Sequence, residues 1–125
     1  MSEPIWLTHD LVVAAHDEGL AIFGGGTGVR DEGLLASALG RPHNQFACGT
    51  ADLTTLSAAY AFGLARNHPF VDGNKRAALS AIFMFLGFND LEFAPDETAA
   101  VLVIEGLADG RVSEAEPAEW IAASD

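Results

Sequence analysis

The sequence has few positively charged residues. It holds 18 Asp and Glu against 6 Lys and Arg, which gives a formal net charge of −12. Proteins that bind duplex nucleic acid depend on many phosphate contacts from Lys and Arg, and anionic membranes likewise attract basic segments. We therefore expect neither nucleic acid nor a membrane among the partners of this protein.

Cysteine and long apolar runs are also scarce. Cys48 is the only cysteine, so no intrachain disulfide can form and nothing suggests an oxidising compartment. The longest uncharged apolar stretch, about Ala77 to Phe88, is shorter than the ~18–20 residues of a membrane helix. The start of the chain, MSEPIWLTHD, lacks the basic segment and apolar run of a signal peptide. Together these features predict a soluble, cytoplasmic protein.

What the sequence does have is an apolar pattern with helical spacing. Its 125 residues, half of them apolar, suffice for one domain with one core, which we take to span residues 1–125. Capping residues, glycines and prolines divide the pattern into six predicted helices, and little of the chain is left for strands. The helices are expected at Leu11–Ala21 (capped by Thr8 or Asp10), from Asp31 or Glu32 to Leu39, from Thr50 or Asp52 to Arg66, from Asn74 to Gly87, from Pro95 or Asp96 to Gly110, and from Ser113 to Ala122. The fold class is thus mostly α, and GRPHNQFACGT, residues 40–50, is expected to be a loop.

A glycine-rich segment, GGGTG at residues 24–28, follows the first predicted helix. It lacks the Gly-Lys-Ser/Thr ending of a phosphate-binding P-loop, and its glycines do not match the GxGxxG spacing. We therefore favour a flexible connector, while a flap that bends over a nearby site stays open as an alternative.

Three of the six basic residues, Arg66, Lys75 and Arg76, lie within residues 66–76. Pro69 interrupts any helix there, so the segment up to Gly73 should be a loop, and a helix should start at the next residue. The first N–H groups of a helix lack intrahelical partners and carry partial positive charge, which makes a helix start a natural anion site. Two cations in that first turn oppose the helix dipole unless an anion such as phosphate binds there.

The other polar residues of this segment suit a bound nucleotide with Mg²⁺. The carboxylate of Asp72 can coordinate Mg²⁺ together with substrate phosphates, and the amide of Asn74 can bind a phosphate oxygen. Histidine as a residue type has a reference pKa of ~6.5, so His68 can take a proton from a hydroxyl nucleophile. Phe70 and Val71 are expected to point into the core. In the alternative interpretation His68 is structural, Asp72 is an N-cap and the cations are surface charges, but the clustering of cations on an acidic chain favours a binding site.

The remaining histidines are expected at ordinary surface or partly buried positions, since two histidines without a third ligand are a weak indication of a metal site. They are His9 and His16 on a predicted helix and His43 in a predicted loop.

The stretch HPFVDGNKR, His68 to Arg76, resembles the signature of the Fic/Doc family, His-x-Phe-x-Asp/Glu-Gly-Asn-Gly/Lys-Arg. The segments GVRDEGLLASALGRP (28–42) and AYAFGLARNHPF (59–70) are similar to its death-on-curing (Doc) branch. The resemblance implies a compact bundle of about six helices, with the motif across a loop and the start of a central helix. It also implies transfer of a phosphate-containing group, usually from ATP with Mg²⁺, to a hydroxyl side chain of a protein.

By this resemblance the motif residues take specific roles. His68 is the general base, Asp72 holds Mg²⁺, and Asn74 and Arg76 bind phosphates. We add Arg76 to the catalytic residues, and we expect further contacts with the nucleotide from Gly73, Lys75 and Arg66.

Departures from the family pattern bear on the reaction type. Members that transfer AMP usually carry Gly at the place of Lys75 and a second Arg at the place of Leu79, and both changes resemble the Doc branch, in which the γ-phosphoryl is transferred. Gly73, however, is like the AMP-transferring enzymes, and Ser80 stands where Doc has an Asn. We favour a kinase, because phosphoryl transfer needs mainly positioning and charge neutralisation, and keep AMP transfer as the alternative.

The resemblance also implies a toxin of a toxin–antitoxin pair. Such a toxin modifies a translation component, elongation factor Tu in the best-known branch, and a Phd-like antitoxin blocks it. Another alternative is a catalytically silent binding module that works through partner contacts. A nuclease is the least favoured, because the charge balance is wrong and a second metal-binding carboxylate is not evident.

Overall fold

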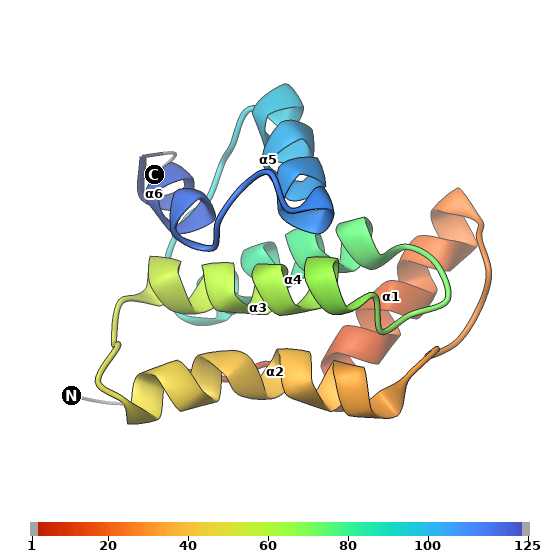
Figure 1. The fold of residues 1–125 in the computed structure, drawn as a ribbon, viewed down its shortest axis with the longest axis horizontal. Helices are drawn as coiled ribbons and strands as arrows, with labels where there is room; N and C mark the ends of the chain where they lie inside the picture. Colours follow the sequence, from red (N-terminus) through yellow and green to blue (C-terminus); the bar gives the residue numbers. More distant parts are fainter. Residues whose placement is uncertain (1–2, 124–125) are drawn as a thin grey trace.

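The computed structural model describes residues 3–123, and within this range the chain forms six helices. They are α1 (His9–Phe23), α2 (Glu32–Ala47), α3 (Leu53–Asn67), α4 (Asn74–Phe88), α5 (Glu97–Asp109) and α6 (Ala115–Ala123). Helix α3 lies at the centre, in contact with α2, α4, α5 and α6, and α1 packs against α4 (Figure 1). The prediction of a mostly α fold with about six helices is confirmed.

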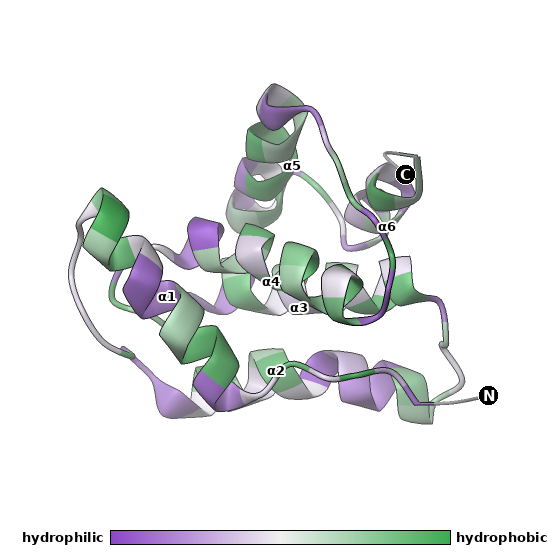
Figure 2. Cartoon of the chain, turned by 180° about the vertical axis from the view of Figure 1, so that it is seen from behind, coloured by the Kyte–Doolittle hydropathy of each residue, from purple (hydrophilic) through white to green (hydrophobic). Residues whose placement is uncertain are grey.

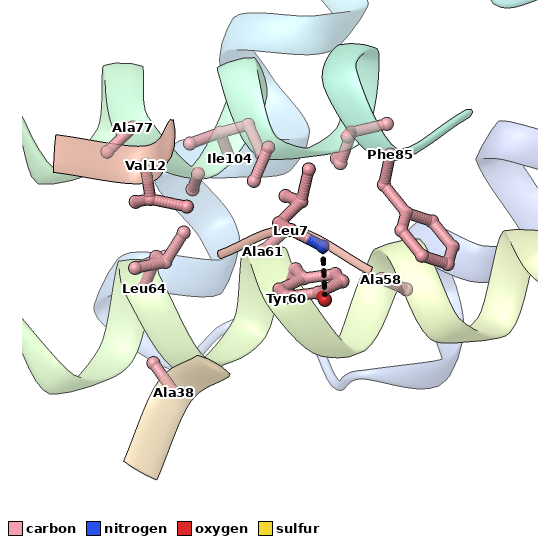
Figure 3. Close-up of a cluster of buried hydrophobic side chains, with 14 of the residues drawn as sticks. Leu7, Val12, Ala38, Ala58, Tyr60, Ala61, Leu64, Ala77, Phe85 and Ile104 are labelled. Carbon is pink, nitrogen blue, oxygen red and sulfur yellow. Dashed lines mark hydrogen bonds between the residues drawn. The ribbon is translucent and has the colours of Figure 1, made fainter. Parts of the chain in front are cut away.

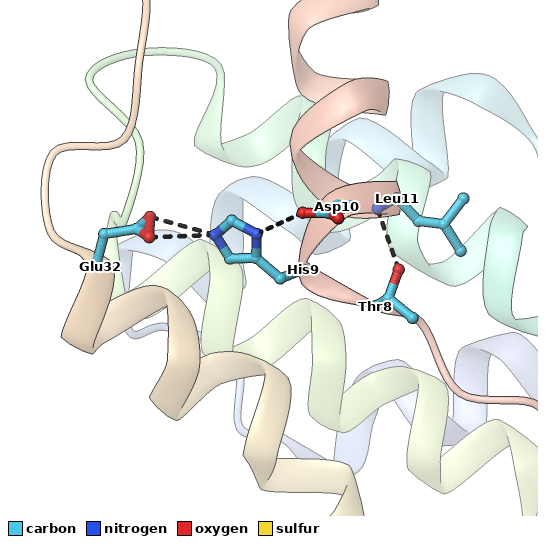
Figure 4. Close-up of polar contacts among 5 residues, drawn as sticks. All are labelled: Thr8, His9, Asp10, Leu11 and Glu32. Carbon is cyan, nitrogen blue, oxygen red and sulfur yellow. Dashed lines mark hydrogen bonds and ion pairs between the residues drawn. The ribbon is translucent and has the colours of Figure 1, made fainter.

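Capping side chains set most of the helix starts, as the sequence predicted. The hydroxyl of Thr8 accepts a hydrogen bond from the Leu11 N–H at 3.2 Å and so caps α1 (Figure 4). The carboxylates of Asp31, Asp52 and Asp96 cap α2, α3 and α5 in the same way. Because an aspartate before a helix satisfies otherwise unpaired N–H groups, these boundaries can be read from short stretches of sequence. Helix α4 runs one residue past the predicted stop at residue 87.

The predicted end of α2 is wrong. The helix does not stop at residue 39 but continues through Pro42 to residue 47, across the expected loop. A proline inside a helix costs about 3 kcal/mol or more, so other contacts must offset it. Pro42 is buried, the His43 ring stacks on Trp6 with 4.0 Å between centroids, and Gln45 donates to Glu114 at 2.7 Å. These partners lie far away in the sequence, so the local pattern could not reveal them.

The core forms where α3 and α4 meet the N-terminal segment (Figure 3). Tyr60 is fully buried, and its hydroxyl oxygen accepts a hydrogen bond from the Leu7 N–H at 3.1 Å. Burial raises the pKa of Tyr60 to about 12. Helices α2 and α3 approach closely at Gly63, where an added Cβ would lie 2.8 Å from the Ala38 Cα. Among the helices of residues 3–123, none is long and apolar enough to cross a membrane.

His9 links α1 to α2 at the surface, as expected for an ordinary position. Its ring nitrogens lie 3.1 Å from an Asp10 carboxylate oxygen and 3.2 Å from one of Glu32 (Figure 4). Hydrogen bonds to Asp10 and then to Glu32 raise the pKa of this imidazole. In the described part of the chain, no group of three or more His, Cys, Asp or Glu side chains could hold a metal ion.

Candidate functional site

The loop between α3 and α4 ends in a helix start that no side chain caps. Gly73 is the N-cap of α4 in the left-handed conformation (φ 75°), and it makes no side-chain cap hydrogen bond. The first intrahelical bond runs from the Ala77 N–H to the Gly73 carbonyl at 2.9 Å, so the three preceding N–H groups have no intrahelical acceptor. Asp72 is therefore not the N-cap of α4, contrary to the alternative interpretation in which His68 is structural and Asp72 caps the helix. An uncapped helix start with cations in its first turn can accept an anion.

This helix start opens into a cavity of about 400 Å³. Six of the seven predicted site residues line it, together with Val71: His68, Asp72, Gly73, Asn74, Lys75 and Arg76. Figure 2 shows hydrophilic colour at the first turn of α4 and white to hydrophobic colour along most of its body. Arg66 is not among the lining residues; its guanidinium lies 5.3 Å from the centroid of the Phe62 ring. The motif thus forms one compact site, and Arg66 stands outside it.

Asp72 presents its carboxylate at the edge of this cavity. One oxygen, Oδ1, accepts a hydrogen bond from the Gly73 N–H at 2.7 Å. The other, Oδ2, faces the glycine run, since a Cβ added at Gly25 would lie 2.7 Å from it. Mg²⁺ is commonly bound by one or two carboxylates plus substrate phosphates and water, so a single aspartate beside an anion-accepting helix start fits a magnesium–nucleotide complex.

Asn74 holds the motif loop through a pair of hydrogen bonds. Its side-chain oxygen accepts from the Phe70 N–H at 2.9 Å, and its amide nitrogen donates to the Phe70 carbonyl at 3.0 Å. Phe70 is 1% exposed, as predicted, but Val71 is 54% exposed, so the expectation that it points into the core is wrong. The backbone here is locally extended and pairs with Val29, and successive side chains of an extended segment point to opposite sides.

Arg76 lies between the cavity and the end of α1. Its guanidinium is 5.1 Å from the Phe23 ring centroid, and Nη2 lies 3.4 Å from the Gly24 carbonyl oxygen. Lys75 is exposed and close enough to Asp109 to contribute to lowering the pKa of that carboxyl, although hydrogen bonding from Arg111 is the main cause. Both cations of the first turn therefore border the cavity from its α1 and α5 sides.

The glycine run lies against the site. Beyond its contact with Asp72, a Cβ added at Gly26 would lie 2.8 Å from Val71 Cγ1. The backbone after the run is fastened to the motif loop: the Val71 N–H donates to the Gly28 carbonyl at 3.1 Å, and the Arg30 N–H to the Pro69 carbonyl at 2.7 Å. The segment therefore forms an edge of the site, whereas the sequence alone favoured a flexible connector and left a flap over a nearby site open.

Two residues that hold the motif loop, Arg30 and His16, were not predicted from the sequence. Arg30 donates from Nε to the His68 carbonyl at 2.8 Å and from Nη2 to the carbonyl of the preceding residue at 2.9 Å. His68 itself has left-handed backbone angles (φ 50°, ψ 55°) at the end of α3. His16, expected at a surface or partly buried position, is 5% exposed and lies beside Asp72. The spacing of Val12, His16 and Leu20 on one face of α1 could have indicated its burial.

Comparisons with known proteins cover most of the chain. Residues 6–86 match the model of the Fic/DOC family, and the motif lies within this range. The chain is 34% identical to "Protein kinase doc" of Escherichia phage P1 over 103 residues, which are 82% of this chain and 81% of that protein. It is 44% identical to "Toxin Doc" of Mycolicibacterium smegmatis over 80 residues, which are 62% of each chain.

Proposed function

The chain belongs to the Fic/Doc family, and on that premise we propose that it is a Doc-type toxin acting as a protein kinase. In this proposal one domain transfers the γ-phosphoryl group of ATP to a hydroxyl side chain of a protein. The observation that carries the proposal is the cavity at the uncapped start of α4, where His68, Asp72 and Arg76 come together. The name of the phage P1 relative supports the kinase class.

The first turn of α4 would hold the phosphates of ATP. Its three free backbone N–H groups and the guanidinium of Arg76 are suited to phosphate oxygens, and Lys75 adds a second positive charge. Asp72 would bind Mg²⁺, which neutralises the phosphate charge during transfer. Asn74, whose side chain is bonded to the Phe70 backbone, would act chiefly by holding the loop in shape.

His68 would accept the proton of the attacking hydroxyl. Its side chain is exposed and lines the cavity, so a hydroxyl on another protein can reach it. Arg30 holds the His68 carbonyl at 2.8 Å, which supports a fixed position for the imidazole. Proton acceptance by a positioned histidine typically contributes about 10²–10⁴-fold to a rate.

Two side chains of α4 favour phosphoryl transfer over AMP transfer. Lys75 occupies the place where AMP-transferring members usually carry glycine, and Leu79 occupies the place of their second arginine. Leu79 lines an apolar groove between α4 and α5, together with Ala100, Val101 and Ile104. A second guanidinium to clamp the terminal phosphates is therefore missing from this position.

The partners in this proposal are a translation factor and an antitoxin. We take elongation factor Tu as the first acceptor to test and the cytoplasm as the place of action. A Phd-like antitoxin would cover the exposed apolar side chains of Ile22 (69%), Phe23 (68%) and Phe83 (43%), which line a cavity of about 390 Å³ between α1 and α4. Exposed apolar patches of this kind commonly mark protein-binding surfaces.

Labelled ATP tests the proposal. Purified protein is incubated with elongation factor Tu and ATP labelled at either the α or the γ position. Transfer of the γ label alone is expected, and it should disappear in the His68→Ala and Asp72→Ala variants while their melting temperatures stay near that of the wild type. Transfer of the α label would instead establish AMP transfer. In a second experiment the wild type and both variants are expressed in bacteria and growth is followed. Growth arrest that persists in both variants would indicate a binding module without catalysis.

A further inference from the structure

We propose that His16 is a positioning residue for Asp72, acting through the peptide bond between Asp72 and Gly73. The inference rests on the proposed function in so far as Asp72 binds the magnesium–nucleotide complex. His16 belongs to α1, 56 residues before Asp72 in the sequence, and it is not among the residues that line the cavity beside His68.

The imidazole of His16 is fixed by two contacts with the motif loop. Its ring stacks on Phe70, with 3.8 Å between centroids and 9° between planes. Its Nε2 lies 2.6 Å from the Asp72 carbonyl oxygen, in a side chain that is 2% exposed. A carbonyl oxygen can only accept a hydrogen bond, so Nε2 carries the proton and donates it.

This hydrogen bond selects one orientation of the peptide unit that follows Asp72. In a trans peptide the carbonyl and the N–H point in opposite directions. With the Asp72 carbonyl directed at His16, the Gly73 N–H points the other way, where it donates to Oδ1 of Asp72 at 2.7 Å. His16 thereby orients the N–H that holds the carboxylate.

The loop needs such a restraint because glycine follows the peptide. Gly73 has a φ of 75°, and glycine adopts positive and negative φ about equally well. Rotation of the peptide unit between Asp72 and Gly73 is therefore less hindered than it would be if a residue with a side chain stood at position 73. His16 would prevent that rotation, which would otherwise remove the hydrogen bond from Oδ1 and let the carboxylate turn.

Two substitutions separate the hydrogen bond from the packing. His16→Phe keeps a ring to stack on Phe70 but has no donor, and His16→Gln keeps an N–H donor at the position of Nε2 without the ring. Val12→Ala is the control, because Val12 is buried on the same face of α1 and its side chain can form no hydrogen bond with the motif. The readouts are the dissociation constant for magnesium–ATP by calorimetry, the KM and kcat of transfer, and the melting temperature.

We expect His16→Phe to raise the dissociation constant and the KM for magnesium–ATP by about 10–100-fold, the usual effect of losing a group that orients a metal ligand. The kcat should change much less, because His68 is held by Arg30 rather than by His16. His16→Gln should restore most of the affinity, and Val12→Ala should lower the melting temperature without changing the KM. Equal defects in His16→Phe and His16→Gln, or wild-type affinity in His16→Phe, would overturn the proposal.

A measurement on the unmodified protein decides the case even if a variant does not fold. In nitrogen-15 NMR of the wild type, His16 should show a protonated Nε2 whose hydrogen exchanges slowly, and protonation at Nδ1 alone would contradict the proposal. The proposed function can fail separately: wild-type protein that transfers no γ label but loses magnesium–ATP affinity in His16→Phe would refute the kinase and leave the positioning role intact.

Discussion

Replacing Gly25 by alanine should displace the carboxylate of Asp72, the proposed Mg²⁺ ligand, without unfolding the protein. A Cβ at this position would lie 2.7 Å from Asp72 Oδ2 and 3.2 Å from its Cγ. The backbone of Gly25 has a φ of 126°, which residues with a side chain rarely adopt. The substitution therefore adds backbone strain and also presses directly on the Asp72 side chain.

The two effects differ in size and in consequence. Backbone strain of this kind costs about 1–3 kcal/mol of stability. Turning the carboxylate away also breaks the 2.7 Å hydrogen bond from the Gly73 N–H, which is worth about 0.5–1.5 kcal/mol. Disturbing the support of a metal ligand typically lowers metal affinity or activity about 10–100-fold. The functional loss should thus exceed what the loss of stability alone would cause.

Gly49→Ala provides the matched control. Gly49 has a similar φ of 110°, but no atom lies within 4 Å of an added Cβ, and it follows α2 away from the cavity. Both variants should lose stability from backbone strain in thermal unfolding, and Gly25→Ala should lose somewhat more because it also breaks the hydrogen bond to Asp72. Only Gly25→Ala should need a higher Mg²⁺ concentration for half-maximal transfer of the γ-phosphoryl. If the two variants show the same Mg²⁺ requirement, the contact between the glycine run and Asp72 has no role in catalysis.

Three further predictions concern Tyr60 and His9, which stabilise the fold, and Arg30, which holds the His68 backbone. Tyr60→Phe leaves the buried Leu7 N–H unpaired and should lower the free energy of unfolding by about 1–3 kcal/mol in urea titrations, with transfer activity unchanged. Because the pKa of Tyr60 is raised to about 12, the wild type should also lose stability between roughly pH 10 and 12 as the unfolded chain ionises first, and Tyr60→Phe should lose less. The raised pKa of His9 means that its contacts stabilise the fold below about pH 6.5 and lose effect as the pH rises, so the melting-temperature difference from His9→Gln should be larger at pH 5 than at pH 8. Arg30→Ala releases the His68 carbonyl and should lower kcat roughly 10–100-fold with little change in the KM for ATP, whereas an unchanged kcat would show that the general base does not depend on this contact.

Local chemistry explains why much of the fold could be predicted. The caps at Thr8, Asp31, Asp52 and Asp96 act on N–H groups two or three residues away, so their effect is visible in a short window of sequence. The motif from residue 68 to residue 76 is likewise contiguous, and six of its predicted site residues line one cavity.

The errors arise where distant residues decide the local structure. Helix α2 passes through Pro42 because contacts from the N-terminal segment and from Glu114 hold its second half. Arg30 and His16 reach the motif from 38 and 56 residues away, and no sequence spacing encodes those contacts. Arg66 is close to the motif in sequence, but on α3 its guanidinium lies beside Phe62 and does not line the cavity.

The mass of the modified acceptor tests the central claim most directly. Elongation factor Tu is incubated with wild-type protein, ATP and Mg²⁺, and its intact mass is measured beside a reaction with His68→Ala. We predict a gain of one phosphoryl group in the wild-type reaction and no gain with the variant. A gain of one AMP, or the same gain with His68→Ala, would contradict this account of the site.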